Sequence, residues 1–348
     1  MSKNLTSIKS KGYFLKKYGE AKSAFELRDF EISSPQENEV LIEVESFGLN
    51  YADVMARNNL YKAAPALPCI LGYEVVGKIL QVGNESNSHL IGKRVVSFTR
   101  FGGYAKHALA TINTCVEIDN LPTFTALSLA TQYVTAFYMC DYLSPVREND
   151  RVLIHAAAGG VGSALIQLCK LKNAIVYAKV SSEEKEDYVT KLGADFSINY
   201  NKSDYSESLE KILQGEKIDA TFNPVAGSTF KKDMKLIGAG GKVILFGGSE
   251  RSGKKWGILS TLNFVRKMGI VIPIGLMMQS KNILGANMLT IADNKPEILA
   301  HCLKSVVKLA QEKKITIENG SEFSANQLAE AHDFLESGKS MGKIIINW

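Results

Sequence analysis

The chain has 348 residues, of which 45% are hydrophobic and 22% are charged, and its formal net charge is +5 at pH 7. This length favours two domains, and the composition is typical of a soluble globular protein rather than a disordered or fibrous one. The small basic excess is scattered along the chain, so nucleic acid is not expected as a partner.

The first residues and the cysteines favour a cytoplasmic localisation. Residues 1–14 are polar and contain several lysines, without the apolar core of a signal peptide. The five cysteines are widely spaced and form no C-x-x-C pair, which argues against a disulfide framework or a cysteine-rich zinc knuckle. We expect reduced thiols at Cys69, Cys115, Cys140, Cys169 and Cys302.

The first third of the chain predicts a small β-rich domain. Residues 40–46 alternate between apolar and polar in the manner of a strand. Further short strands separated by glycines are expected at residues 75–82, 93–98 and 104–109.

A glycine turn at residues 156–162 is the strongest functional signal. A short apolar strand at residues 152–154 precedes it, and a helix with periodic apolar residues from Val161 to Leu171 follows it. Gly159 would let the backbone approach a pyrophosphate, Gly162 would let helix and strand pack closely, and the helix N-terminus would face the anion. Ala157 occupies the place of the usual first glycine. An ordinary tight turn is the alternative interpretation.

The residues after the turn favour NADP(H) over NAD(H). A second strand at residues 175–180 and a helix at residues 183–192, closed by Gly193, complete a βαβ unit. NAD-specific sites carry an acid after the second strand, but this chain has Ser181 and Ser182 there, followed by Lys185. These residues offer two hydroxyls and a cation to a 2′-phosphate. In the alternative interpretation the serines only cap the helix, and Ser182, Lys185 and their neighbours are solvated.

The remainder of the chain predicts a doubly wound α/β region, followed by a final portion of two helices and a strand. Strands at residues 196–200, 219–223 and 242–247 alternate with helices near residues 206–214 and 230–237. After them we expect helices at residues 296–313 and 323–338 and a closing strand at residues 342–348.

The longest apolar stretch runs from Gly269 to Met278 and is too short to cross a bilayer as a helix, so no transmembrane segment is expected. Met277 and Met278 add adaptable apolar surface that could serve a lid, a membrane-facing patch or a subunit contact. A buried strand or a dimer interface is the favoured interpretation.

Several segments together resemble the medium-chain dehydrogenase/reductase family, and specifically its zinc-independent quinone oxidoreductase branch. They are residues 47–53 (FGLNYAD), 72–74 (GYE), 101–104 (FGGY) and 156–162 (AAAGGVG). Residues 50–57 with Leu60 and Tyr61 most resemble the vesicle amine transport protein group within that branch.

The resemblance implies an α/β protein with a GroES-like β-rich catalytic domain plus a doubly wound Rossmann domain. It places the catalytic domain at residues 1–132 and 289–348 and the NADP-binding Rossmann domain at residues 133–288, with cofactor and substrate meeting between them. It also implies a homodimer formed through edge strands near residues 283–288.

No metal centre is expected. Zinc-dependent relatives carry a cysteine ligand in the loop that here contains Asn50, and a histidine ligand in the motif that here reads Gly72-Tyr73-Glu74. The structural four-cysteine lobe is also missing, and no histidine has a partner at ligand spacing. An alcohol dehydrogenase would need the absent zinc to lower the pKa of a hydroxyl. Glu74 and His155 are interpreted as structural residues.

The resemblance therefore implies an NADPH-dependent, metal-free reductase of quinones or α,β-unsaturated carbonyl compounds. Asn50 and Tyr61 are the candidate polar contacts to the nicotinamide or the acceptor, although Tyr61 could equally be a loop aromatic covering the core. Met55 replaces a tyrosine that many relatives carry. The alternative function is an NADPH-binding interaction protein, or a vesicle- or membrane-associated protein, with little or no turnover.

The resemblance carries cofactor contacts over to Thr135, which is expected to begin the first helix of the Rossmann half, and to the ends of the predicted strands and the turns that follow them. These are Thr135, Ala158, Gly159, Gly160, Val161, Gly162, Ser181, Ser182, Lys185, Tyr200, Asn223, Phe246, Gly247 and Gly248.

Overall fold

The computed structural model describes residues 7–251, 257–317 and 320–348. The chain divides into two compact units. Unit 1 combines residues 1–134 with residues 289–348, and unit 2 is the continuous stretch 135–288. The boundary between residues 134 and 135 falls inside a helix, α4 (Val134–Phe137).

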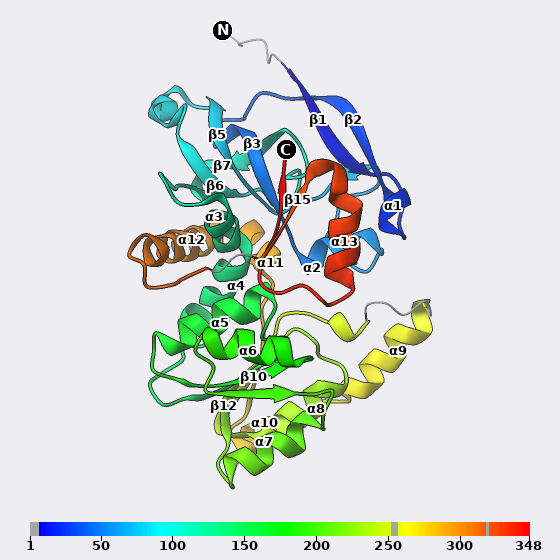
Figure 1. Ribbon diagram of the computed structural model, residues 1–348, viewed down its shortest axis with the longest axis vertical. Coiled ribbons are helices and arrows are strands. Elements are labelled where there is room, and N and C mark those ends of the chain that lie inside the picture. The colour runs from blue at the N-terminus through cyan, green and yellow to red at the C-terminus, as the bar shows by residue number, and fades with distance from the viewer. Residues whose placement is uncertain (1–6, 252–256, 318–319) are drawn as a thin grey trace. The chain divides into compact units, whose positions relative to one another are not determined.

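Unit 2 is built on a six-stranded parallel sheet in the order β11-β10-β9-β12-β13-β14 (Figure 1). The first two strands in sequence, β9 and β10, continue outward to β11, whereas β12 begins a second series on the other side of β9. This reversal creates a topological switch point, where open α/β sheets bind ligands beyond the carboxyl ends of their strands. The strands are β9 (Arg151–Ile154), β10 (Ile175–Val180), β11 (Phe196–Asn199), β12 (Ile218–Asn223), β13 (Ile237–Leu245) and β14 (Asn282–Gly285).

Helices alternate with these strands because their apolar residues recur at helical spacing. In α7, Tyr205, Leu209 and Leu213 lie four residues apart and are all buried in the core that contains Leu153 and Ile198. The helices that follow α4 are α5 (Gly160–Lys170), α6 (Glu183–Lys191), α7 (Tyr205–Leu213), α8 (Ser228–Leu236), α9 (Gly257–Met268) and α10 (Pro273–Gln279).

Unit 1 contains two sheets. The larger one has the order β15-β16-β3-β5-β6-β8, with β7 also paired to β3, and the smaller one has the order β2-β1-β4. Residues from both ends of the chain meet in the larger sheet, because β16 pairs antiparallel with β3 and Ile344 lies opposite Leu49. The strands are β1 (Ile8–Leu15), β2 (Phe25–Ile32), β3 (Glu39–Leu49), β4 (Cys69–Ile70), β5 (Glu74–Val82), β6 (Arg94–Phe98), β7 (His107–Thr111), β8 (Cys115–Glu117), β15 (Ser321–Ser324) and β16 (Ile344–Asn347).

Helices pack against the sheets of unit 1, and those at residues 21–24, 51–57 and 328–336 contribute Ala24, Ala56 and Leu328 to one core with Phe47, Val75 and Ile346. The helices are α1 (Ala21–Ala24), α2 (Tyr51–Arg57), α3 (Thr123–Ser128), α12 (Pro296–Gln311) and α13 (Leu328–Glu336), and α11 (Met288–Asn294) begins at the unit boundary. From Thr123 to Leu143 the chain is helical throughout, with π-helical turns at Leu129–Tyr133 and Tyr138–Leu143.

Two elements of unit 1 differ from the expectations. Strands β1 and β2 were not among the predicted elements; they pair with each other, and β1 also pairs with β4. Phe323, expected to begin a helix, lies in β15, because this segment pairs with β16 and the helix α13 starts only at Leu328.

The apolar stretch Gly269–Met278 is not a buried strand, so that half of the expectation was wrong, whereas the dimer interface stays a prediction. Gly269 ends α9 with φ of +80°, residues 269–272 are not helical, and Pro273 begins α10. None of the residues of α10 is buried, and Met277 and Met278 are 71% and 79% exposed.

Candidate functional site

The glycine turn of unit 2 lies between β9 and α5, at the carboxyl edge of the parallel sheet. Gly159 is the N-cap of α5, and Ser163 donates its backbone N–H to the carbonyl of Gly159 over 2.8 Å. The N–H groups of Gly160, Val161 and Gly162 belong to the first turn, where a helix supplies no carbonyl partners. Such a helix end attracts an anion through these N–H groups and through the helix dipole.

Gly162 is required by the packing of this turn. A Cβ atom at position 162 would lie 2.5 Å from the carbonyl oxygen of Ala156 and 2.6 Å from the Cα of Ala157, and both are backbone atoms that cannot move aside easily. At Gly159 the nearest atom to an added Cβ would be 3.2 Å away. Ala156 adopts a left-handed conformation with φ of +48°, which a residue with a side chain rarely takes. The turn is therefore tightly built around backbone, as a pyrophosphate cradle requires.

A second glycine segment follows β13 at the same edge of the sheet. Phe246, Gly247 and Gly248 come directly after Leu245, and the backbone N–H of Phe246 donates to the carbonyl of Asn223 over 3.2 Å. A Cβ on Gly247 would lie 2.7 Å from the carbonyl oxygen of Pro224. Backbone rather than side chains thus lines this part of the edge.

Asn223 has a structural role that the sequence did not indicate. Its side-chain NH₂ donates to Thr229 over 2.8 Å and to Asp233 over 2.7 Å, while its side-chain oxygen accepts from the N–H groups of Val225 and Ala226, each over 2.9 Å. The amide is fully engaged and buried, so it organises the turn after β12. A side-chain contact from Asn223 to a cofactor stays a prediction that this geometry does not favour.

The predicted 2′-phosphate residues gather at the ends of β10 and β11. The Ser182 hydroxyl caps α6 by accepting the N–H of Lys185 over 3.3 Å, which agrees with the alternative interpretation of this serine. Ser181 and Lys185 are half-buried, and burial lowers the pKa of the Lys185 ammonium. Tyr200 is 46% exposed. Lys202, which the sequence did not single out, lies close by and pairs with Glu183 and Glu186 over 3.0 and 3.2 Å.

A buried polar chain lies directly beside this edge. His155 follows β9 and contacts Asp233 of α8 through Nε2 over 3.0 Å and the Lys179 ammonium through Nδ1 over 3.4 Å. Tyr205 also donates to Asp233, over 2.9 Å. Burial lowers the pKa of His155, so a neutral imidazole donates to Asp233 and accepts from Lys179. His155 was expected to be a packing residue; it is buried, and it also carries this network.

Thr135 does not begin a helix, as the sequence suggested, but lies inside α4 within the long helical run. π-helical turns lie directly before and after α4 within this helical segment. Such turns are frequent at functional sites. The predicted cofactor contact of Thr135 stays a prediction.

In unit 1, Asn50 and Glu74 form a buried cluster with Lys343 from the other end of the chain. The Asn50 amide donates to both carboxylate oxygens of Glu74, over 2.9 and 2.8 Å, and its oxygen accepts from the Lys343 ammonium over 3.1 Å. Lys343 also forms an ion pair with Glu74, and both side chains are fully buried. Thr131 donates to the same carboxylate. Gly48 makes room for it, because a Cβ there would lie 1.9 Å from a Glu74 oxygen.

This cluster does not fit a zinc ion. The two loops in which zinc-dependent relatives carry ligands here present an amide and a carboxylate, and an internal ammonium already neutralises that carboxylate. A divalent cation would be repelled by Lys343 and would lack the three Cys, His or carboxylate donors it needs. Over the described ranges, no group of three such residues could hold a metal.

Asp53 lies next to this cluster and is completely buried. Its carboxylate accepts the N–H groups of Asn50 over 2.9 Å and of Gly72 over 3.2 Å. Removal from water raises the pKa of Asp53 to about 7, although these two N–H groups favour the ionised form. The acid therefore titrates near neutral pH.

The two predicted catalytic residues differ in availability. Asn50 is 8% exposed and its amide is committed to Glu74 and Lys343. Tyr61 lies in the loop after α2, where it packs against the core of unit 1 and its ring meets that of Tyr73 edge to face, with centroids 6.5 Å apart. Burial raises the pKa of the Tyr61 hydroxyl, so it stays protonated and able to donate at neutral pH. Within unit 1, Tyr61 is the better candidate donor.

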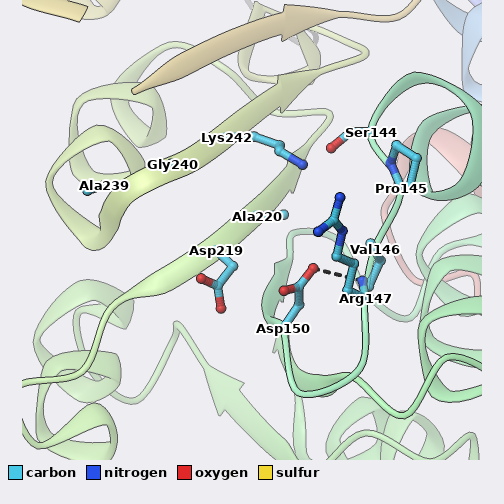
Figure 2. A pocket seen from close by; sticks show the side chains of 10 residues that line it. All are labelled: Ser144, Pro145, Val146, Arg147, Asp150, Asp219, Ala220, Ala239, Gly240 and Lys242. Atoms are coloured by element: carbon cyan, nitrogen blue, oxygen red, sulfur yellow. Dashed lines mark hydrogen bonds between the residues drawn. The ribbon is translucent and has the colours of Figure 1, made fainter. Parts of the chain in front are cut away.

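Unit 2 has a surface pocket at the opposite edge of its sheet (Figure 2). Asp150 and Asp219, which lie at the amino-terminal ends of β9 and β12, line it together with Arg147 and Lys242. Dinucleotides bind at the carboxyl ends of such strands, so this pocket is not the predicted cofactor site.

Two protein families match the chain. Residues 160–305 match the family described as zinc-binding dehydrogenase, and residues 36–135 match the alcohol dehydrogenase GroES-like domain. Together the matches cover most of unit 2 and the first part of unit 1.

Relatives and solved structures agree with these matches. The chain is 29% identical over 310 residues to the synaptic vesicle membrane protein VAT-1 homolog of Danio rerio, covering 88% of this chain and 64% of that protein. It is 28% identical over 321 residues to the quinone oxidoreductase of Rattus norvegicus, covering 91% of this chain and 92% of that protein. The solved Escherichia coli quinone oxidoreductase complexed with NADPH shares the fold, with a TM-score of 0.85 at 23% identity over 97% of this chain and all of that one (100%).

Proposed function

Because the chain belongs to the medium-chain dehydrogenase/reductase superfamily, in its quinone oxidoreductase and VAT-1-like branch, we propose that it is an NADPH-dependent, metal-free reductase of quinones or α,β-unsaturated carbonyl compounds. The observation that carries this proposal is the turn around Gly162. This turn is too tight for a side chain at position 162, and it lies at the N-terminus of α5. The Escherichia coli relative with the same fold was solved with NADPH.

The residues of unit 2 fit this cofactor. The N–H groups of Gly160, Val161 and Gly162 would hold the pyrophosphate, and the bare backbone at Gly247 would face the nicotinamide ribose. Ser181, Lys185 and Tyr200 would surround the 2′-phosphate, with Lys202 as a further cation nearby. An acid at the end of β10, which would repel that phosphate, is missing from the sequence.

The cluster in unit 1 determines which acceptors fit. When bound, NADPH supplies a hydride and water supplies a proton, so that a quinone becomes a hydroquinone or an enone becomes a saturated ketone. Lys343 and Asn50 already engage Glu74, so this carboxylate is not available as a metal ligand, which supports a reaction without a metal. The acceptor must already contain an electrophilic carbon, and Tyr61 would donate a hydrogen bond to its developing negative charge.

A steady-state screen of NADPH oxidation with benzoquinone, naphthoquinone and alkyl vinyl ketones tests the proposal. We expect oxidation well above the rate without acceptor, and a reduced kcat for Tyr61→Phe. Oxidation no faster than the blank with every acceptor, despite tight NADPH binding, would overturn the reductase function.

Cofactor choice is tested separately with Lys185→Glu. We expect this variant to weaken NADPH binding at least tenfold and to change NADH binding little, because only NADPH brings a phosphate to that cation. Lys191→Glu, on the same helix but at its exposed far end, is the matched control. Equal losses for both cofactors would contradict the assigned role of Lys185.

A second candidate is a dinucleotide-binding interaction protein with little turnover. The exposed apolar residues of α10 favour it, since an enzyme acting alone on small molecules has no need of them. The acceptor screen separates the two candidates, because this one predicts binding of NADPH without its oxidation.

A further inference from the structure

A buried ammonium lies beside the residues of unit 2 that we assign to the 2′-phosphate. Lys179 is the last residue but one of β10, two positions before Ser181, and it is only 7% exposed. The backbone N–H of Tyr200, which follows β11, donates to the carbonyl of Val180 over 3.0 Å. Lys179 therefore belongs to the same short stretch of the carboxyl edge as Ser181 and Tyr200.

The Lys179 side chain lies on the side of the sheet that α7 and α8 cover. Figure 1 shows these two helices on one side of the sheet and α5 and α6 on the other. The ammonium lies over the ring of Tyr205, which begins α7, at 4.1 Å from the centroid, and over the ring of Tyr200 at 4.8 Å. Because Tyr200 is half-exposed and Lys179 is buried, a bound phosphate can meet the outer side of the Tyr200 ring while the ammonium lies at its inner side.

No carboxylate forms an ion pair with this ammonium among the residues that the structure describes. Its hydrogen-bond partner is Nδ1 of His155, at 3.4 Å, and Asp233 lies at the other nitrogen of that imidazole, at 3.0 Å. Asp233 also accepts from Tyr205 over 2.9 Å and from Asn223 over 2.7 Å. Three neutral groups thus satisfy the nearest acid, and Lys179 receives its charge only across the imidazole.

The other charged groups that face Lys179 are already paired. Asp204, the N-cap of α7, forms an ion pair with Lys232 of α8, and Glu250 forms one with Lys267 of α9. Burial is the main reason that the pKa of Lys179 is lowered to about 8, and these acids oppose it only in part. A further negative charge nearby would therefore stabilise an ammonium that the protein alone holds weakly.

We propose that Lys179 is a specificity-determining residue that favours NADPH over NADH, because its ammonium attracts the 2′-phosphate from the inner side of the Tyr200 ring. The inference rests on the NADPH binding that the proposed function includes. A phosphate held by Ser181, Lys185 and Tyr200 brings the negative charge that Lys179 lacks, whereas NADH brings none. Since the ammonium is shielded from water, the attraction acts over a longer distance than between exposed charges.

Titration calorimetry of the full chain with NADPH and with NADH tests this role, since it measures binding and not turnover. At pH 7, where Lys179 is charged, we expect Lys179→Met to weaken NADPH binding roughly fivefold and to change NADH binding little. Lys191→Met is the matched control, because it removes an exposed ammonium at the far end of α6. This control should change the binding of neither cofactor.

The pH dependence separates Lys179 from the exposed cations. As the pH rises from about 7 to about 9.5, free Lys179 loses its proton, so the wild type should lose part of its preference for NADPH. At about pH 8.5 the phosphate is already ionised, and its binding should raise the pKa of Lys179 and take up part of a proton. Titrations in buffers of different ionisation enthalpy measure this uptake. We expect Lys179→Met to abolish it and Lys185→Gln, at saturating NADPH, to retain it.

Three results would overturn the inference and leave the proposed function standing. The first is an unchanged ratio of NADPH to NADH affinity in Lys179→Met, including an equal loss of both, which would assign Lys179 a purely structural role. The second is the absence of proton uptake when the wild type binds NADPH. The third is an uptake that persists in Lys179→Met and disappears in Lys185→Gln, which would assign it to Lys185. Failure of the wild type to bind NADPH would instead overturn the proposed function itself, and this inference with it.

Discussion

Each unit buries a carboxylate near a lysine, but the two units neutralise that carboxylate differently. In unit 1, Lys343 contacts Glu74 directly, and Asn50 and Thr131 occupy the remaining positions on the carboxylate. In unit 2, His155 stands between Lys179 and Asp233, and no ion pair joins these two within the described residues.

The difference teaches what each lysine does for its unit. Lys343 balances the charge of its neighbour, so loss of either member leaves the other exposed to a low dielectric. Lys179 gains less from its surroundings: burial lowers its pKa to about 8, and its ammonium lies over the rings of Tyr205 and Tyr200, at 4.1 and 4.8 Å from their centroids. We therefore expect the stability of unit 1 to depend on the charge of Lys343, whereas burying the charge of Lys179 costs unit 2 some of its stability.

The largest expected effect comes from removing the lysine of unit 1. Lys343→Met leaves the Glu74 carboxylate buried without a cation, and we expect the free energy of unfolding to fall by about 3–5 kcal/mol in urea denaturation. The double variant Lys343→Met, Glu74→Gln should recover part of this loss. A double variant as unstable as the single one would show that charge balance is not the reason.

Asp53 gives unit 1 a dependence on pH. Its pKa of about 7 in the folded state exceeds the usual 3.8, so folding favours the protonated acid, and this contribution is lost as the pH rises from about 4 through about 7. Relative to Asp53→Asn, we expect wild-type stability to fall by up to about 4 kcal/mol over that window. Parallel stability profiles for the two proteins between pH 4 and 8 would refute the assignment.

Lys179 gives unit 2 the opposite dependence. Its pKa of about 8 in the folded state lies below the usual 10.5, so the unfolded chain holds the proton more tightly and stability increases as the pH rises from about 8 towards 10.5. Compared with Lys179→Met, the wild type should gain up to about 3 kcal/mol in thermal or urea unfolding over this range. No relative gain would mean that the ammonium is hydrated in the folded protein.

The smallest expected effect is the loss of one hydroxyl from the network of unit 2. Tyr205→Phe removes a hydrogen bond to the ionised Asp233, and we expect a loss of about 2 kcal/mol. A double-mutant cycle with Asp233→Asn measures the part that belongs to this pair. A coupling energy near zero would show that the hydroxyl contributes only through its other contact, with the carbonyl of Thr229.

The sequence predicted the elements of unit 2 better than its networks. Strand β10 was expected at residues 175–180, where it lies, because a continuous apolar run bounded by polar residues signals a buried parallel strand. The sequence suggested a ligand contact for Asn223 and a packing role for His155. Their shared hydrogen-bond partner Asp233 lies on a helix further along the chain, so the network could not be seen in the local pattern. Local patterns do not reveal which side chains a fold brings together.

In unit 1, the partner of Glu74 could not be predicted at all. Lys343 is 269 residues away in sequence, and only the antiparallel pairing of β16 with β3 brings it to the cluster. The prediction of a buried strand at Gly269–Met278 was wrong for a related reason. The composition of this segment is that of a core strand, but the sheet of unit 2 is completed by Asn282–Gly285, so that the apolar stretch lies outside the core.

The pairing of β16 with β3 has a consequence for the synthesis of this protein. Unit 2 is continuous, so all of its residues have left the ribosome while unit 1 still lacks its last strand. Until Ile344–Asn347 emerge, the larger sheet of unit 1 is incomplete and Glu74 has no Lys343. We therefore expect the nascent chain to fold in the order unit 2 and then unit 1. A chain stalled shortly before Lys343 should carry a protease-resistant unit 2 attached to a protease-sensitive N-terminal region.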